Sequence, residues 1–226
     1  MDSAPDLAMA WLDGPLGARV LRDETAVAAL ALDDVFGFEL LQFGIWGADA
    51  PLLAAARTQH RTVVAPLPKP GATLVAALDG LPLRSDSIDA VLLPHSLERV
   101  DDPYAVLREA ERVLCAEGCL LICGFNPWSG WGLRRHFERA LGRPAFPPGT
   151  RRLLSERRLR DWVALLGFDV DYVRGYLGKV PVAGAYWLKA RKRVKSLTPL
   201  RLKRRSRQRV LVTAPEATTK VGHDRH

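Results

Sequence analysis

Residues 81–127 constrain the fold more than any other part of this chain. The run Ile88–Leu93 is short and almost wholly apolar, as expected for a strand buried on both faces. Asp102-Pro103 has the pattern of a helix N-cap followed by a first-turn proline. The turn residues Glu117-Gly118 then lead into a second apolar run, Cys119–Cys123. A strand, a helix and a strand in this order predict two parallel strands with a right-handed crossover, and therefore an α/β fold.

Five short motifs follow one another in this region: Leu81-Pro82-Leu83, Ser87-Ile88-Asp89, Asp102-Pro103, Arg112-Val113-Leu114 and Glu117-Gly118-Cys119. In order and spacing they resemble those of class I S-adenosylmethionine-dependent methyltransferases. The resemblance implies a Rossmann-like sandwich with a seven-stranded, mostly parallel sheet and a late antiparallel hairpin. It also implies S-adenosylmethionine as cofactor and methyl transfer to an acceptor that the sequence does not identify. Because folds host many functions, the motifs indicate the fold more strongly than the activity.

The rest of the chain predicts the remaining elements of such a fold. Helical spacing of apolar residues covers 16–35 and 131–141, a short helix covers 51–57, and a further helix begins at Ser155-Glu156. Further strands are predicted at 38–43, 61–65, 73–77 and 168–176. The seventh strand has two candidates, Tyr186–Arg191 and Arg209–Thr213. The first is favoured because its distance from the sixth strand suits a hairpin.

The charge of the chain is concentrated near its end. The net charge is +8, yet residues 172–215 hold thirteen Lys or Arg and no acid, so the remainder is net acidic. We therefore expect one methyltransferase-like domain over residues 1–194 and a basic, flexible tail over residues 195–226. No apolar run is long enough to span a membrane, and the start of the chain lacks a signal-peptide layout, which together predict a cytoplasmic protein.

The basic segment Lys189–Arg209 is a candidate contact for a polyanion. Eleven of its twenty-one residues are Lys or Arg, which suits either nucleic acid or an anionic membrane surface. Few aromatic residues are interleaved, and this argues against a stacking platform for single strands. A solvated tail that aids solubility is the simpler alternative.

The loop after the first predicted strand corresponds to the glycine-rich motif of the family. The resemblance places cofactor contacts at Gln42 and Gly44, with Gly47 as a displaced partner, since glycine lets the backbone approach the ligand closely. This sequence departs from the family pattern twice here: the usual acid is Gln42 and the middle glycine is Trp46. Turn glycines without a ligand are the simpler interpretation.

Two further cofactor positions of the family are altered. The end of the second strand, where the family places a ribose-binding acid, is Ala65-Pro66. The position of the adenine-binding acid is Ala77. The nearby Asp79 and the backbone of Leu78 are the candidates for adenine recognition, although Asp79 also suits a turn with Gly80.

The loops after the fourth and fifth strands supply the candidates for chemistry. His95 and Glu98 lie where the family lines the space between cofactor and acceptor: His95 for proton removal and cofactor contact, Glu98 for holding a cationic group. A capped loop histidine and a helix-start glutamate are the structural alternatives. Asn126, Trp128 and Trp131 follow the fifth strand and are candidates to bind and cover the acceptor, or else to form a structural cap.

The three cysteines predict no metal site. Cys115, Cys119 and Cys123 are four residues apart, too far for a disulfide along one strand and without the turn that a zinc site needs. We expect them to pack as small hydrophobic side chains. The altered cofactor motifs leave a rival open, a non-catalytic protein that keeps the fold but has lost cofactor binding.

Overall fold

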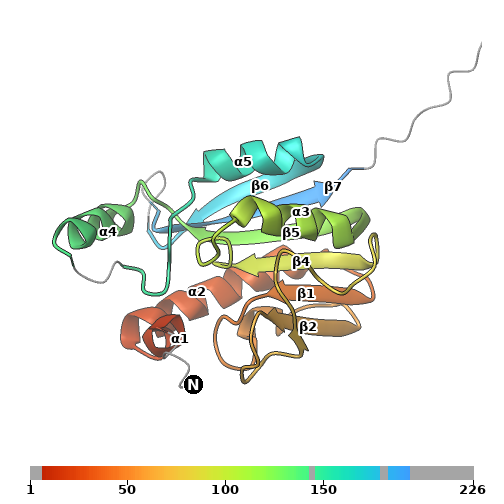
Figure 1. Cartoon of the computed structure of the whole chain (residues 1–226), viewed down its shortest axis with the longest axis horizontal. Coiled ribbons are helices and arrows are strands. Elements are labelled where there is room, and N and C mark those ends of the chain that lie inside the picture. Colours follow the sequence, from red (N-terminus) through yellow and green to blue (C-terminus); the bar gives the residue numbers. More distant parts are fainter. Residues whose placement is uncertain (1–6, 143–145, 179–182, 194–226) are drawn as a thin grey trace, which may run out of the picture. The chain divides into compact units, whose positions relative to one another are not determined.

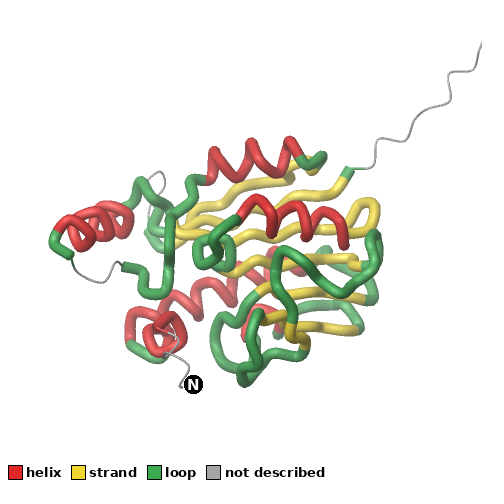
Figure 2. The backbone as a smooth tube through the Cα atoms, viewed as in Figure 1, coloured by secondary structure: helices red, strands yellow, loops and turns green. Residues whose placement is uncertain are grey.

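The structure is a computed structural model that describes residues 7–142, 146–178 and 183–193. The described strands lie side by side in a sheet, and helices cover both of its faces (Figures 1 and 2). This confirms the predicted α/β fold. In chain order the elements are α1 Leu7–Leu12, α2 Pro15–Leu32, β1 Glu39–Phe43, the 3-10 turn η1 Pro51–Leu53, β2 His60–Ala65, β3 Leu74–Val75, β4 Ile88–Pro94, α3 Pro103–Val113, β5 Leu114–Phe125, α4 Gly130–Ala140, α5 Glu156–Leu165, β6 Phe168–Tyr176 and β7 Ala185–Lys192.

The strand order is β3-β2-β1-β4-β5-β7-β6. The first five strands in this order are parallel, and β7 lies antiparallel between β5 and β6. The sheet therefore has the mostly parallel arrangement with a late hairpin that the sequence predicted. The favoured candidate for the seventh strand is confirmed, since Tyr186 pairs with both Gly124 of β5 and Gly175 of β6.

Alternate residues of the central strands face two hydrophobic layers. In β4, Val91 and Leu93 pack with α3 and α5, whereas Ala90 and Leu92 pack with α1 and α2. All four side chains are fully buried. Because both faces are covered, the strand needs apolar side chains along most of its length, which explains the almost wholly apolar run in the sequence.

Two predicted elements are shorter than expected. The helix predicted at 51–57 is only the 3-10 turn η1, because the chain must turn after Leu53 to enter β2 at His60. The strand predicted at 73–77 is reduced to Leu74–Val75. Beyond it the chain folds back, and Ala77 pairs with Gly80 in an isolated bridge.

The turn predicted at Glu117-Gly118 lies inside a strand. Helix α3 runs directly into β5 at Leu114, and the strand register shifts between the pairs Ile88–Leu114 and Ala90–Cys119. Glu117 has a φ of 62°, so the turn-forming residues produce an irregularity in the strand and no break.

The basic residues of β7, and Arg193 directly after it, are engaged within the fold. Lys192 pairs with Asp86 at 2.9 Å, Arg191 with Asp171 at 3.1 Å, and Arg193 with Asp169 at 3.1 Å. Lys189 is buried and pairs with Asp34. The rest of the basic segment, the second strand candidate at 209–213 and the predicted tail at 195–226 lie outside the described residues. None of the helices in the described ranges has the length and apolar character that crossing a bilayer demands.

Candidate functional site

A cavity of about 160 Å³ lies at the carboxyl ends of β1, β2 and β4. This is the edge at which open α/β sheets bind ligands. Two of the predicted cofactor residues, Gly44 and Leu78, line it. The full lining is Gly44, Ile45, Ala65, Pro66, Lys69, Leu78, Ser96, Arg99 and Val100.

Hydrogen bonds fasten the loop after β1 to its neighbours. Gly44 has a φ of 83°, and its backbone N–H donates to the carbonyl of Val64 at 2.7 Å. The hydroxyl of Ser96 donates to the carbonyl of Phe43, and a guanidinium N–H of Arg99 donates to the carbonyl of Ile45 at 3.3 Å. The cavity wall is therefore built jointly by the loops after β1 and β4.

The other predicted cofactor residues lie outside the cavity lining. Gln42 is fully buried and donates to the carbonyl of Gly44 at 2.9 Å, while its Oε1 has no partner among the described residues. Gly47 has a φ of 81°, and a Cβ there would lie 2.8 Å from a methyl carbon of Leu21. Close packing thus accounts for this glycine without a ligand. Asp79 is exposed.

The polar character of the cavity differs from the family pattern. Ala65 and Pro66 line it where the ribose-binding acid would stand. No carboxylate belongs to the lining within the described ranges, and its charged members are Lys69 and Arg99. Apolar groups therefore form most of the wall, and positive charge lies beside them.

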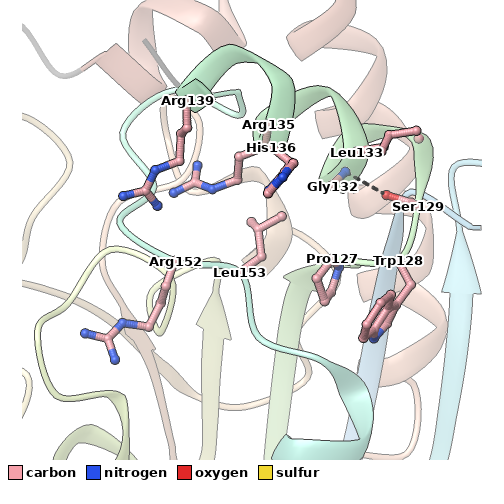
Figure 3. Close-up of a pocket in the computed structure, with 11 residues that line it drawn as sticks. Pro127, Trp128, Ser129, Gly132, Leu133, Arg135, His136, Arg139, Arg152 and Leu153 are labelled. Carbon is pink, nitrogen blue, oxygen red and sulfur yellow. Dashed lines mark hydrogen bonds between the residues drawn. The ribbon is translucent and has the colours of Figure 1, made fainter. Parts of the chain in front are cut away.

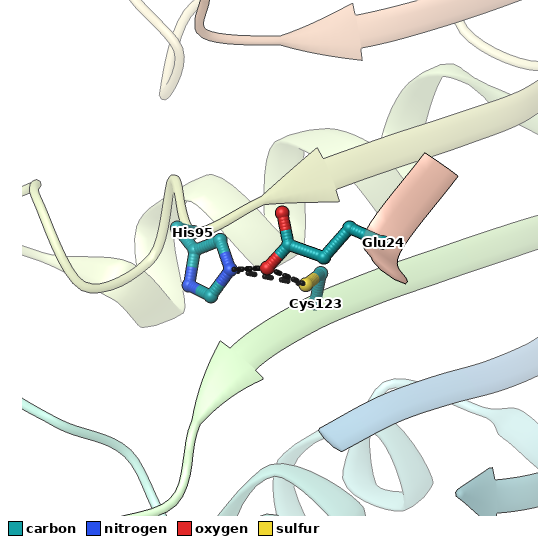
Figure 4. A group of neighbouring side chains, drawn as sticks. All are labelled: Glu24, His95 and Cys123. Carbon is teal, nitrogen blue, oxygen red and sulfur yellow. Dashed lines mark hydrogen bonds and ion pairs between the residues drawn. The ribbon is translucent and has the colours of Figure 1, made fainter. Parts of the chain in front are cut away.

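His95 and Glu98 are buried in the loop after β4, where their sequence neighbours Ser96 and Arg99 line this cavity. His95 has no exposed surface, and its two ring nitrogens lie 2.8 Å from carboxylate oxygens, Nδ1 from Glu98 and Nε2 from Glu24. Figure 4 shows His95 beside Glu24 and Cys123. Tyr176 donates to Glu24 at 2.7 Å. The Sγ of Cys123 lies 3.1 Å from Nε2 of His95 and 2.8 Å from the Tyr176 hydroxyl. We call these five residues the His95 network.

The electrostatics of the network favour a charged histidine. Burial disfavours the imidazolium, but Cys123, Glu24 and Glu98 outweigh it and raise the pKa of His95 well above its ordinary range. Burial raises the pKa of Glu98, and raises that of the Cys123 thiol to about 12. An imidazolium that donates to two carboxylates is therefore the arrangement that satisfies both ring nitrogens.

The network fixes the loop that forms the cavity wall. Oε1 of Glu98 accepts from the backbone N–H of Phe125 at 2.6 Å, and the Glu98 carbonyl accepts from the N–H of Arg151 at 2.7 Å. His95 has a φ of 52°, a left-handed conformation that needs support from its surroundings. Ser96 and Arg99 follow directly and line the cavity. The network therefore holds the loop that supplies part of the cavity wall.

Three atoms of the network are also of metal-ligand type. The carboxylate of Glu24, Nε2 of His95 and the thiol of Cys123 lie within 4.8 Å of one another. Each already has a hydrogen-bond partner in the network, so we interpret the group as a hydrogen-bonded cluster. The sequence prediction that the cysteines are small hydrophobic side chains fits buried Cys119, but Cys123 contacts polar groups and Cys115 is partly exposed.

Sequence patterns missed three members of the His95 network, Glu24, Cys123 and Tyr176. Glu24 lies in a run of polar residues on α2, which suggests a solvated face, yet it is fully buried. Its second oxygen accepts from the indole N–H of Trp46 at 2.5 Å. Trp46, which replaces the middle glycine of the family motif, thus joins the network through Glu24. The one signal in the sequence was that Glu24 lies one helical turn from apolar Val20 and from apolar Ala28.

A larger, open pocket of about 710 Å³ lies between α4 and the segment around Arg152. Figure 3 shows Arg135, His136 and Arg139 extending from α4 toward Arg152 and Leu153, with Trp128 at the other end. The predicted acceptor residue Trp128 therefore lines a pocket. It is 82% exposed.

The other two predicted acceptor residues are held by the protein itself. The amide group of Asn126 donates to the carbonyl of Ala183 at 3.1 Å, and its oxygen accepts from the N–H of Trp128 at 2.9 Å. Trp131 packs against Phe125 and Phe146, with ring centroids 5.5 and 5.2 Å apart. Both side chains support the loop after β5, and neither lines the 710 Å³ pocket.

The comparisons with known proteins agree with this fold. Residues 41–122 match the family described as a methyltransferase domain. A solved S-adenosylmethionine-dependent methyltransferase of Thermotoga maritima, described as a possible histamine N-methyltransferase, superposes with a TM-score of 0.61 at 17% identity. The alignment covers 81% of this chain and 94% of that one. The chain thus contains a segment that matches a methyltransferase domain, and it has the fold of solved S-adenosylmethionine-dependent methyltransferases, as its five motifs implied.

Two curated relatives are similar in sequence and carry no assigned activity. The uncharacterized protein YafS of Escherichia coli K12 is 38% identical over 136 residues, which are 60% of this chain and 55% of YafS. The uncharacterized protein Rv2003c of Mycobacterium tuberculosis H37Rv is 30% identical over 186 residues, 80% of this chain and 64% of that protein. The matches therefore span less than two thirds of the length of either relative.

Proposed function

We propose that this protein is an S-adenosylmethionine-dependent methyltransferase whose cofactor binds at the 160 Å³ cavity and whose acceptor binds in the 710 Å³ pocket. The observation that carries the proposal is the loop at residues 95–100. Ser96 and Arg99 line the cavity, while the carbonyl of Glu98 accepts from Arg151 and Arg152 beside the pocket. One rigid segment therefore links the two spaces.

The cavity residues fit the cofactor in part. Leu78, Val100 and Pro66 offer an apolar surface for the adenine ring, Gly44 lets the backbone approach the ligand, and Arg99 suits its carboxylate. The missing acid leaves the ribose hydroxyls without their usual partner. Because 160 Å³ is below the roughly 300 Å³ of small-molecule sites, binding requires the cavity to widen.

The reaction asks the chain for positioning and for exclusion of water. When bound, the cofactor supplies a methyl group on a positively charged sulfur. The residues of the chain hold the acceptor in line with that group and keep water away. His95 and Glu98 act as positioning residues in this proposal, because the network engages both ring nitrogens of His95.

The acceptor pocket indicates the chemistry that its ligand would have. Arg139 and Arg152 bring positive charge to a wall that also contains Trp128, Leu133 and Leu153. An acceptor with an anionic group and an apolar part matches this lining.

Calorimetry with S-adenosylmethionine and S-adenosylhomocysteine tests the cofactor site. We expect micromolar binding that is lost in Gly44→Arg and in Val100→Trp, which fills the cavity without placing a side chain at a positive φ. Val75→Trp is the matched control, because Val75 lies on the edge strand β3 and is 49% exposed. Circular dichroism verifies that each variant is folded.

The absence of binding by folded wild-type protein at millimolar ligand would overturn the proposal. It would favour the non-catalytic alternative, which is supported by the small cavity and by the lack of a carboxylate among its described lining residues. The proposed polyanion contact through Lys189–Arg209 would then be the next activity to test, with its residues from 195 onward carrying it.

A further inference from the structure

Helix α4 packs with its polar side inward. Its one buried residue among those described is Arg135, whereas Leu133 is 59% and Phe137 60% exposed. Leu141, which caps the helix, is 67% exposed. These three residues are four positions apart and therefore lie along one side of the helix. We call them the α4 stripe.

The inward side of α4 is firmly attached, so the stripe cannot turn toward the core. The guanidinium of Arg135 donates to the carbonyls of Thr150 and Arg151, both at 2.9 Å. Trp131 packs against Trp11 and Phe146. Figure 1 shows α4 beyond the end of the sheet, apart from the other labelled helices. The orientation of the stripe is therefore set by the fold.

An exposed indole lies at the start of the same helix. Trp128 comes two residues before Gly130, the first residue of α4, and is 82% exposed. Monomeric proteins rarely leave several large apolar side chains together in water. The exposed side chains of the stripe and of Trp128 therefore indicate a surface that a binding partner covers.

The charge around the stripe specifies the partner. Residues 130–141 contain one acid, Glu138, and three arginines, of which Arg135 is buried. That acid is engaged by Arg134 at 2.8 Å and by the backbone N–H of Phe146 at 2.8 Å. Arg139 and Arg152 lie close by in the wall of the pocket. The covering surface must therefore be apolar within and negative at its boundary.

We propose that α4 docks on an anionic lipid bilayer, with the α4 stripe and Trp128 inserted at the boundary between headgroups and acyl chains. Short helices that lie in this boundary have Leu, Phe and Trp on one side and Arg or Lys on the other. Trp128 and Leu133 also line the 710 Å³ pocket, so docking places that pocket at the membrane surface. The inference goes beyond the proposed methyl transfer and does not depend on it.

Vesicle flotation of the full chain, without cofactor, tests the proposal. We compare vesicles of phosphatidylcholine alone with vesicles that also contain phosphatidylglycerol. The wild type should bind the anionic vesicles. The triple variant Leu133→Gln/Phe137→Gln/Leu141→Gln should bind them with an affinity at least about tenfold lower. Leu165→Gln is the matched control, because Leu165 is a 77% exposed leucine on α5, and its binding should stay within about twofold of wild type.

Trp128 provides an independent readout. Brominated lipids quench indoles that enter the acyl region, so quenching should be present in the wild type and reduced in Trp128→Phe. Three results would overturn the proposal. They are no binding of the wild type to either vesicle, equal binding of wild type and triple variant, and a wild-type dimer that the triple variant converts to monomer. The second would assign membrane binding to the basic segment, and the third would make the stripe an interface between two copies.

Discussion

The His95 network and helix α4 both reverse the usual distribution of side chains, in opposite directions. The network places two carboxylates and a histidine where apolar groups are expected, whereas α4 turns leucines and a phenylalanine to solvent and buries an arginine. The network is complete in itself, since each ring nitrogen of His95 has a partner. The α4 stripe is not covered by any of the described residues. Burial alone therefore does not distinguish a structural element from a functional surface. The distinction depends on whether the side chains find their partners within the protein.

The largest expected change in the free energy of unfolding comes from disrupting the His95 network. His95→Ala would leave Glu24 and Glu98 buried without their cation, and we expect a loss of about 3–5 kcal/mol in the free energy of unfolding. Denaturant unfolding measures it. The control is His136→Ala, since His136 is exposed on α4, and it should stay within about 0.5 kcal/mol of wild type. A loss under about 1 kcal/mol for His95→Ala would show that the ion pairs contribute little net stability.

A smaller effect is expected from pH. The folded state raises the pKa values of His95 and Glu98, so it binds more protons than the unfolded state and its stability falls as pH rises. The contribution of His95 is complete below about pH 6.5 and is lost as pH rises through the folded pKa. The slope reaches at most about 1.4 kcal/mol per pH unit for each proton.

Denaturant midpoints between pH 6 and 8 measure this slope. Cys123, with its pKa of about 12 in the folded state, remains protonated throughout that range. His95→Gln should flatten the profile. Parallel profiles for the two proteins would mean that folding does not raise the pKa of His95.

The smallest change in stability is expected for a substitution in the α4 stripe. Phe137→Ser removes a large apolar side chain from α4 but should change the free energy of unfolding by no more than about 0.5 kcal/mol, because the side chain is mostly in water. Its buried counterpart is Phe125, which stacks on His95 with ring centroids 3.9 Å apart. Phe125→Ala should cost about 3–5 kcal/mol in the same denaturant experiment. Comparable losses would mean that Phe137 is packed in solution.

The sequence predicted the features that depend on neighbours along the chain. The apolar run of β4, the proline at the start of α3 and the Ser155 cap of α5 each depend on a few adjacent residues, and all are present. Of the cofactor residues, Gly44 and Leu78 line the cavity, while Gln42, Gly47 and Asp79 do not. Gly44 lines the cavity and Gly47 does not, because Leu21 packs against Gly47. Local sequence does not show this contact.

The features that sequence patterns missed depend on distant partners. Glu24 is 71 residues from His95. Its spacing from Val20 and Ala28 on α2 indicates burial, but no local pattern identifies His95 as its partner in the core. The inverted packing of α4 has the same cause. Arg135 is buried because the carbonyls of Thr150 and Arg151 accept from it, and that segment follows α4 by a loop whose path the sequence does not reveal.

The wide spacing of the network along the chain also governs when the cavity wall can form. Tyr176 and Glu24 are 152 residues apart, so their contact closes a very large loop and must wait until β6 has joined the sheet. We therefore expect the wall to assemble late in folding, after the central strands. The amide of Phe125, which donates to Glu98, is its reporter, and pulse-labelling hydrogen exchange should find it protected later than the amides of β4. A nascent chain that ends before Tyr176 would form the carboxyl ends of the central strands without the Tyr176–Glu24 hydrogen bond of the His95 network.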